Sequence, residues 1–260
     1  MMKKIYKSIG LATIMLFSFY YTEKIAILMQ NKSPIMQNIN EVADNYEVNA
    51  TNASIEGDYI IPGIRGKKLN KTKSYVNMKS FGVFNEYYFV FDEVKPTISL
   101  EDNVDKIIKK GNGNKKAVAF LLENNSDIKN YLEENKIAGS ILIKEGDYQK
   151  NSYFEQINND GEKYSNVESL LNKNEHNKNI CYIKSLNPDF CKKNHKFLVE
   201  ETFFLSGSNI VEAKRNITSG SIILIKETAK LEEFKLLVKE INFKGLSIVS
   251  LSDLITEKKI

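Results

Sequence analysis

The sequence predicts an α/β protein with a largely parallel sheet in its C-terminal part, and three observations support that prediction. Residues 117–122 and 222–225 are continuous apolar runs, as expected for strands buried on both faces. A helix with one apolar face is predicted over residues 231–241, and a second helix over residues 126–135. Strands that alternate with helices along a chain typically form parallel sheets.

Shorter signals complete the expected order of elements. Residues 141–143 and 247–249 are predicted to be short strands. The polar segment 147–173 is predicted to be helical in parts. Gly245 is expected to end the long helix as a C-cap, and Ser252 is expected to N-cap the last helix.

The N-terminus has the pattern of an export signal, because an apolar run at residues 9–21 follows a basic flank of Lys3, Lys4 and Lys7. No small-residue cleavage site follows the run. We therefore predict an uncleaved anchor at residues 1–24, with its basic end in the cytoplasm and the rest of the chain outside. The run is shorter than the roughly 20 residues of a typical span. A cleaved signal peptide, which would give a secreted protein, and a buried N-terminal strand or helix are the alternatives.

The two cysteines suit an exported protein. Nine residues lie between Cys181 and Cys191, and the turn signal 187–189 lies among them. A turn can bring two such cysteines within disulfide range, and an oxidising compartment allows the bond. Two unpaired buried thiols are one alternative, and a zinc site with His176 and His195 is another. The zinc site lacks the paired close spacings that such sites normally use.

The remaining chain is expected to divide into three parts after the anchor: a polar stalk at 25–58 with a short helix at 36–45, an N-terminal extension at 59–114, and a main domain at 115–260. The extension should contain a helix at residues 71–79 and an aromatic strand at residues 87–91. Tyr75 and the aromatic residues of that strand could stack on sugar rings. Packing in a core explains their alternating pattern better.

Composition limits the possible functions. The net charge of +4 is small and evenly spread, which gives no footprint of a dedicated nucleic-acid binder. The chain has two His, so a metal centre with several His ligands could use only these two. His176 lies in a polar loop and is expected to be solvated. We predict no resident metal or other cofactor.

The C-terminal pattern supports a more specific interpretation. Residues 220–225 read Gly-Ser-Ile-Ile-Leu-Ile, and residues 244–255 read Lys-Gly-Leu-Ser-Ile-Val-Ser-Leu-Ser-Asp-Leu-Ile. A strand, a helix, a Lys-Gly turn, a closing strand and a short helix in this order resemble the polysaccharide deacetylase (NodB-homology) family, over roughly residues 115–257. Residues 59–112 resemble the N-terminal part of exported deacetylase-like proteins of Gram-positive bacteria. The resemblance implies a distorted (β/α) barrel of the polysaccharide deacetylase type with an N-terminal α/β extension.

The resemblance also implies a chemistry that can be looked for residue by residue. In that family one Asp and two His hold a divalent metal, a second Asp is the general base and a late His is the general acid. The family's first motif, T-F-D-D-G, corresponds to residues 121–125. Glu123 falls at the position of the base and Asn124 at that of the metal-binding Asp. A neutral amide is a far weaker ligand than a carboxylate for a hard cation.

The other family positions are also altered. The second motif, G-H-E-I-G-N-H-x-x-x-H, is matched weakly at residues 161–166, which places Val167 and Leu171 at the two metal-binding His. At i and i+4 these aliphatic residues fit the buried face of a helix instead. Lys226 replaces the late His. Neither Arg65 nor Arg215 lies in the context of the family's Arg motif.

The leading hypothesis is therefore a deacetylase-like protein on the outer face of the membrane without metal-dependent activity or catalytic residues. It would bind cell-envelope polysaccharide or a surface protein. A divergent enzyme that hydrolyses C–N bonds with Glu123 and Lys226 is the alternative, and a purely structural protein is a third class. The resemblance places Glu123, Asn124 and Lys226 in one candidate pocket, because the C-terminal ends of barrel strands meet at one mouth.

Overall fold

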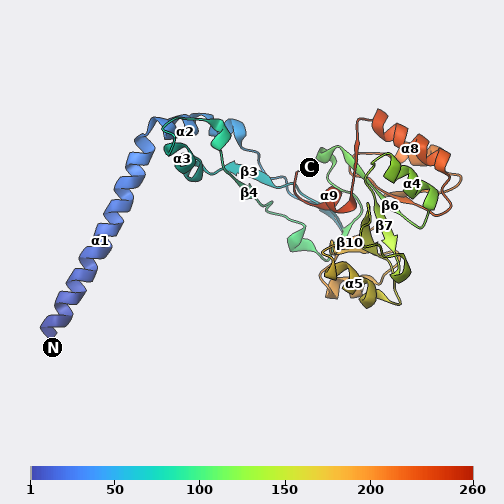
Figure 1. Cartoon of the computed structure of the whole chain (residues 1–260), viewed down its shortest axis with the longest axis horizontal. Helices are drawn as coiled ribbons and strands as arrows, with labels where there is room; N and C mark the ends of the chain where they lie inside the picture. Colours follow the sequence, from blue (N-terminus) through green and yellow to red (C-terminus); the bar gives the residue numbers. More distant parts are fainter. Residues whose placement is uncertain (1, 260) are drawn as a thin grey trace. The chain divides into compact units, whose positions relative to one another are not determined.

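The computed structural model describes residues 2–259, with side chains described from Ala12 onward. This part of the chain forms two compact units (Figure 1). Unit 1 comprises Met1–Asn49 and Gly66–Val94, and unit 2 comprises Ala50–Arg65 and Lys95–Ile260. The division differs from the predicted boundaries at residues 59 and 115. The expected stalk is not separate, because its helix packs in unit 1.

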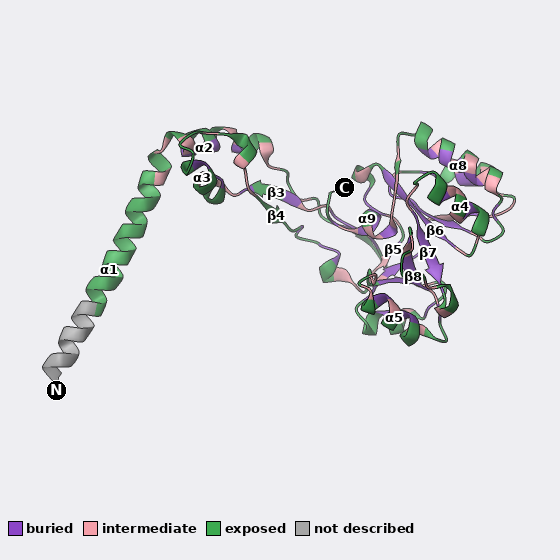
Figure 2. Cartoon of the chain, viewed as in Figure 1, coloured by how far each residue is buried: buried purple, intermediate pink, exposed green. Residues whose placement is uncertain are grey.

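Among the described residues, unit 1 contains three α-helices and one antiparallel pair of strands: α1 (Met2–Lys32), α2 (Pro34–Tyr46), α3 (Lys71–Lys79), β3 (Gly66–Leu69) and β4 (Phe91–Val94). Its small core joins Met36, Ile39 and Ala43 of α2 to Leu69 and Met78. The predicted helices at residues 36–45 and 71–79 are thus both present. α1 extends well beyond the predicted apolar run. Nearly all of its described side chains are exposed (Figure 2).

The predicted aromatic strand at residues 87–91 is wrong. A 3₁₀ turn, η1 (Glu86–Tyr88), replaces its first half, and β4 begins at Phe91. Asn85 starts this turn by accepting a hydrogen bond from the backbone N–H of Tyr87. Tyr87 is 90% exposed, so it does not belong to the core face that the alternating pattern predicted.

Unit 2 is built around a parallel sheet with the strand order β11-β12-β6-β7-β8 and with β13 beside β6. Its strands are β6 (Ala117–Leu122), β7 (Ser140–Ile143), β8 (Glu155–Asn158), β11 (Phe203–Leu205), β12 (Ile222–Ile225) and β13 (Ser247–Val249). The strands predicted at residues 117–122, 141–143, 222–225 and 247–249 all lie here. The α/β prediction with a largely parallel sheet is confirmed.

A second sheet has the order β1-β2-β5-β10-β9. Its strands are β1 (Ser54–Glu56), β2 (Tyr59–Ile61), β5 (Ile107–Ile108), β9 (Ile180–Tyr182) and β10 (Phe197–Val199). β2, β5, β10 and β9 are parallel, and β1 pairs antiparallel with β2. The chain passes from β10 of this sheet into β11 of the parallel sheet through residues 200–202.

The two sheets enclose one apolar interior and form a distorted (β/α) barrel. Along β6, Ala117, Ala119 and Leu121 contribute to this interior, and the alternate residues pack against the outer helices. A bridge between Lys110 and Ser221 links the sheets on one side. Gly220 makes this close approach possible, because it has a φ of +89° and a Cβ there would lie 2.2 Å from the Gly111 carbonyl oxygen.

Four helices cover the outer face of the parallel sheet: α4 (Ser126–Glu134), α5 (Tyr164–Lys173), α7 (Ile210–Asn216) and α8 (Leu231–Phe243). Phe120 of β6 and Phe234 of α8 are fully buried, with ring centroids 5.0 Å apart. Gly245 has a φ of +67° after α8, as the C-cap prediction requires.

The short helix α9 (Leu251–Ile255) closes the N-terminal end of the barrel. The backbone N–H of Leu251 donates to Ser140 Oγ at the start of β7, and Leu251, Leu254 and Ile255 enter the interior core. Ser250, rather than the predicted Ser252, is the N-cap, because its Oγ accepts a hydrogen bond from the N–H of Asp253.

Cys181 of β9 and Cys191 of α6 (Pro188–Lys193) form a disulfide with their Cα atoms 6.1 Å apart. Both cysteines are fully buried and pack against Leu186 and Leu198. Since disulfide sulfurs are not thiolate ligands, the alternative zinc site does not form. His195 is exposed in the turn after α6.

Candidate functional site at the barrel mouth

The C-terminal ends of the parallel strands meet at one mouth of the barrel, and a polar or charged residue follows nearly every strand there. Glu123 follows β6, Lys144 follows β7, Asn159 and Asp160 follow β8, and Lys226 follows β12. Ligand sites of parallel barrels form at this end. We therefore asked which of the predicted site residues lie at this mouth.

Glu123 and Lys226 are brought together as predicted. The Lys226 Nζ lies 2.9 Å from Glu123 Oε1, and the backbone N–H of Glu227 donates to Glu123 Oε2 at 3.0 Å. Both carboxylate oxygens of Glu123 thus accept hydrogen bonds from the two residues that follow β12. About a third of each side chain remains exposed, which limits what this ion pair contributes to stability.

Asn125 fixes the loop that carries Glu123. Its side-chain oxygen accepts from the N–H of Ile128 and caps α4, while its Nδ2 donates to the carbonyls of Glu227 and Ala229. These bonds tie the ends of β6 and β12 together. Asn124, at the family's metal-ligand position, is exposed on the same loop.

The second sheet adds charged groups that the sequence analysis missed. The Tyr182 hydroxyl, at the end of β9, donates to Glu201 Oε2 at 2.9 Å. Burial raises the pKa of Tyr182, and the negative charges of Glu201 and Glu123 raise that pKa further. Glu200 pairs with Lys184 at 2.9 Å, also near the ends of these strands. The signal that could have found these residues is their position directly at the end of a short apolar run.

Val167 and Leu171 do not lie at the mouth. Both are buried in α5, in the core between this helix and the sheet, as expected for i and i+4 positions on an apolar face. At the weak match of the second family motif, core residues thus stand at the two positions of the metal-binding His. Asp160 lies at the end of β8 instead.

Asp160 has a structural role at this strand end. Its carboxylate accepts hydrogen bonds from the backbone N–H groups of Lys163, Glu145 and Glu162, at 2.8–3.1 Å. These bonds lower the pKa of Asp160, with the Lys163 bond as the largest cause. They hold the β7 and β8 loops against each other and keep the carboxylate occupied.

A polar cleft of about 580 Å³ lies between these loops at the mouth. It is lined by Lys144, Glu145, Gly146, Asn159, Asp160, Gly161, Glu162, Lys163 and Ser185. Lys163 and Glu145 form an ion pair across it at 2.6 Å. The side-chain oxygen of Asn159 is buried without a hydrogen-bond partner in the described part of the chain, so the cleft retains an unused acceptor.

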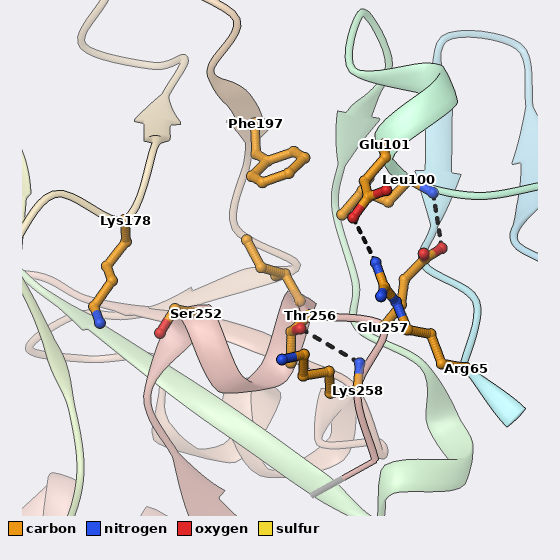
Figure 3. A pocket seen from close by; sticks show the side chains of 10 residues that line it. Arg65, Leu100, Glu101, Lys178, Phe197, Ser252, Thr256, Glu257 and Lys258 are labelled. Atoms are coloured by element: carbon orange, nitrogen blue, oxygen red, sulfur yellow. Dashed lines mark hydrogen bonds and ion pairs between the residues drawn. The ribbon is translucent and has the colours of Figure 1, made fainter. Parts of the chain in front are cut away.

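A second cavity, of about 250 Å³, lies at the opposite end of the barrel beside α9 (Figure 3). Its lining includes Phe197, Leu100 and Ile255, and Arg65 forms an ion pair with Glu101 at 2.5 Å. The backbone N–H of Leu100 donates to Glu257 at 2.7 Å. Since residues at the N-terminal end of a barrel mainly serve stability, we assign the functional site to the mouth with Glu123.

The donor set at the mouth does not fit the family's metal ion. Asn124 supplies an amide in place of a carboxylate, and the aliphatic Val167 and Leu171 lie in the core. Glu123 is already bonded to Lys226. Among the residues that the structure describes, no three His, Cys, Asp or Glu side chains are grouped to hold a metal.

No protein-family model matches the sequence. A segment of 93 residues is 40% identical to the uncharacterized protein YlxY of Bacillus subtilis (strain 168), and the match spans 35% of this chain but only 29% of that protein. The chain also resembles BA3943, a CE4 family pseudoenzyme from Bacillus anthracis, with a TM-score of 0.58 and 18% identity over 87% of this chain and 96% of that one. A BA3943 mutant described as having restored enzymatic activity gives a TM-score of 0.57, at 18% identity over 87% of this chain and 99% of that chain. This chain thus has the fold of the family 4 carbohydrate esterases, the polysaccharide deacetylases.

Proposed function

We propose that this protein is a membrane-anchored, extracytoplasmic, deacetylase-like module that binds cell-envelope polysaccharide without hydrolysing it. The observation that carries the proposal is which residues occupy the family's catalytic positions at the mouth of the barrel. Glu123, at the position of the family's base, is bonded to Lys226, and an amide stands at the position of the metal-binding Asp. A barrel without that carboxylate has lost one ligand of the Lewis acid that polarises an acetamide carbonyl in the family.

Two features support the location. Within α1, the stretch Ala12–Lys32 is long and apolar enough to cross a membrane. Its 21 residues would span about 30 Å, the thickness of the hydrocarbon core of a bilayer. The disulfide between Cys181 and Cys191 fits an oxidising compartment outside the cytoplasm. A signal peptide that is cleaved would release the same module as a secreted protein.

The fold shared with a protein described as a pseudoenzyme supports the loss of catalysis. The polar cleft supports binding. Lys144 and Lys163 offer ammonium donors, Glu145 and Asn159 offer acceptors, and the hydroxyl and acetamido groups of an amino-sugar polymer can pair with both kinds. A polysaccharide therefore fits this mouth better than an apolar ligand does.

The alternative is a divergent amidohydrolase that uses Glu123 and Lys226. General acid–base catalysis needs an acid and a base close to the same substrate atoms. The 2.9 Å contact between these two side chains meets that requirement. The same contact occupies the carboxylate that would have to accept a proton. We therefore place binding first.

Binding is tested by measuring the affinity of the full chain, in detergent, for purified cell-wall glycan and acetylated chitooligosaccharides. Lys144→Glu is expected to weaken binding about 10-fold or more, because it removes an ammonium donor from the cleft. Lys239→Glu, on the exposed face of α8, makes the same charge change away from the cleft and should leave the affinity within about 2-fold. Retention on no glycan, or equal effects of the two substitutions, would overturn glycan binding at this cleft. Retention of a surface protein instead would identify the other partner class.

A further inference from the structure

Unit 1 carries an exposed aromatic patch that neither the barrel nor its mouth explains. The patch consists of Phe81, Val83, Tyr87 and Tyr88. Tyr87 is 90% exposed, Phe81 59% and Val83 58%. The Phe81 ring stacks on Tyr88 at 4.8 Å with an angle of 15°, and the Tyr87 ring meets Tyr88 edge-on at 6.0 Å. Exposed aromatic side chains that lie against one another are typical of an interaction surface.

The patch is held in place from beneath. Tyr88 packs against the core of unit 1, which contains Met36, Ile39 and Met78. The backbone N–H of Tyr87 is bonded to Asn85, and this bond keeps the turn that exposes the ring. The aromatic side chains are therefore presented by packed elements, which reduces the conformational entropy lost when they bind.

The same unit contains the candidate membrane span. α1 ends at Lys32 and α2 begins at Pro34, and α2 supplies Met36 and Ile39 to the core that supports Tyr88. α2 has 13 residues and is about 20 Å long. If Ala12–Lys32 crosses a bilayer, the patch is tethered within a few nanometres of that bilayer's surface.

The chemistry of the patch matches the membrane–water interface. Tyr and Phe rings are favoured there, since an apolar body and a polar hydroxyl suit the headgroup region. Helix α3, which precedes the patch, carries Lys71 and Lys79, and such side chains attract anionic lipid headgroups, while its Lys73 pairs with Asp92 at 3.6 Å. A sugar site would need directional hydrogen-bonding groups beside the rings. The nearby carboxylate of Glu86 is already bonded to the Tyr46 hydroxyl.

We propose that the aromatic patch inserts into the headgroup region of the bilayer that α1 crosses and thereby holds unit 1 against the membrane surface. This inference rests on the proposed anchor. Two contacts, a span and an interfacial patch, would fix the orientation of unit 1, whereas a span alone leaves a flexible tether.

The chain contains no Trp, so a single introduced Trp reports its own surroundings. Three variants of the full chain are reconstituted into vesicles of phosphatidylcholine and phosphatidylglycerol with acyl chains brominated near the headgroup. Tyr87→Trp reports on the patch and Phe17→Trp on the span. Phe243→Trp, at a site in unit 2 that is 87% exposed, is the matched control for a solvated ring.

Tyr87→Trp is expected to emit at shorter wavelength than Phe243→Trp and to lose most of its emission to the brominated lipid. Quenching of Phe17→Trp without quenching of Tyr87→Trp would show that α1 crosses the bilayer but that the patch does not insert into it. An unquenched Phe17→Trp would overturn the anchor itself. A change in Tyr87→Trp emission on adding soluble glycan, but not with lipid, would assign the patch to sugar binding instead.

Discussion

Replacing Lys196 by Met is expected to lower the free energy of unfolding by about 3–5 kcal/mol, because the change leaves a buried carboxylate without its counter-charge. The Lys196 Nζ lies 2.5 Å from Glu168 Oε2, and the two side chains are 5% and 12% exposed. Lys196 precedes β10 and Glu168 belongs to α5, so the pair joins a helix to the second sheet.

The amides around this pair cannot replace the charge. Asn158 Nδ2 donates to Glu168 Oε1 at 3.2 Å, and Asn177 Nδ2 donates to Glu168 Oε2 at 2.7 Å. Two neutral donors satisfy hydrogen-bonding capacity but leave the net charge of Glu168 in a poorly solvated site. The expected loss is therefore larger than that of an ordinary surface ion pair.

Urea unfolding of the full chain in detergent measures the effect. Lys235→Met, which removes an exposed i, i+3 partner of Glu232 on α8, is the control and should cost less than about 1 kcal/mol. The double variant Lys196→Met with Glu168→Gln should recover much of the lost stability, since no unpaired charge remains. Equal losses for Lys196→Met and Lys235→Met would show that Glu168 is not buried as described.

Leu171→His is expected to lower the free energy of unfolding by about 3 kcal/mol or more, and added zinc should not restore it. The substitution exchanges a fully packed aliphatic side chain, 2% exposed, for an imidazole whose N–H finds no partner in the core. Val167→His should behave in the same way, because Val167 lies one turn earlier on the same buried face.

Leu171→Met, which nearly conserves the side-chain volume, is the matched control and should cost less than about 1.5 kcal/mol. The comparison separates the polarity of His from simple repacking. Stoichiometric zinc binding by Leu171→His, accompanied by a gain in stability, would contradict the burial of Leu171 in the core.

The parts of the fold predicted correctly are those where one local pattern determines the answer. The run Ala117–Leu122 is apolar throughout because both faces of β6 are covered, and such a run allows only a buried element. The helix predicted over 231–241 was found as α8 because its buried residues repeat at helical spacing. The juxtaposition of Glu123 and Lys226 followed from parallel strand ends.

The missed elements depend on side chains whose partners are distant or polar. β8 was not predicted because two of its four residues, Gln156 and Asn158, are buried polar groups. Gln156 exchanges two hydrogen bonds with the backbone of Gln149, which makes a polar residue stable inside the protein. An apolar pattern cannot reveal such a strand.

The hydrogen bond between Tyr182 and Glu201 was also missed, because 18 residues separate these side chains in sequence and the pair forms only when β9 and β10 become neighbours. The strand predicted at residues 87–91 was wrong because local hydrogen bonds outweigh the alternating pattern. Its alternating rings favour a strand, but Asn85 and Ser74 bind the backbone N–H groups of Tyr87 and Val90 and stabilise a turn.

The central claim is that this barrel has kept the deacetylase fold without the metal-dependent reaction. Its most direct test is to purify the full chain with zinc supplied, determine the bound metal per chain, and measure acetate release from acetylated chitooligosaccharide. We expect substoichiometric zinc and acetate release no faster than that of buffer, because an amide, an ion-paired Glu and two core aliphatic residues occupy the family positions. One zinc per chain together with acetate release would contradict the claim.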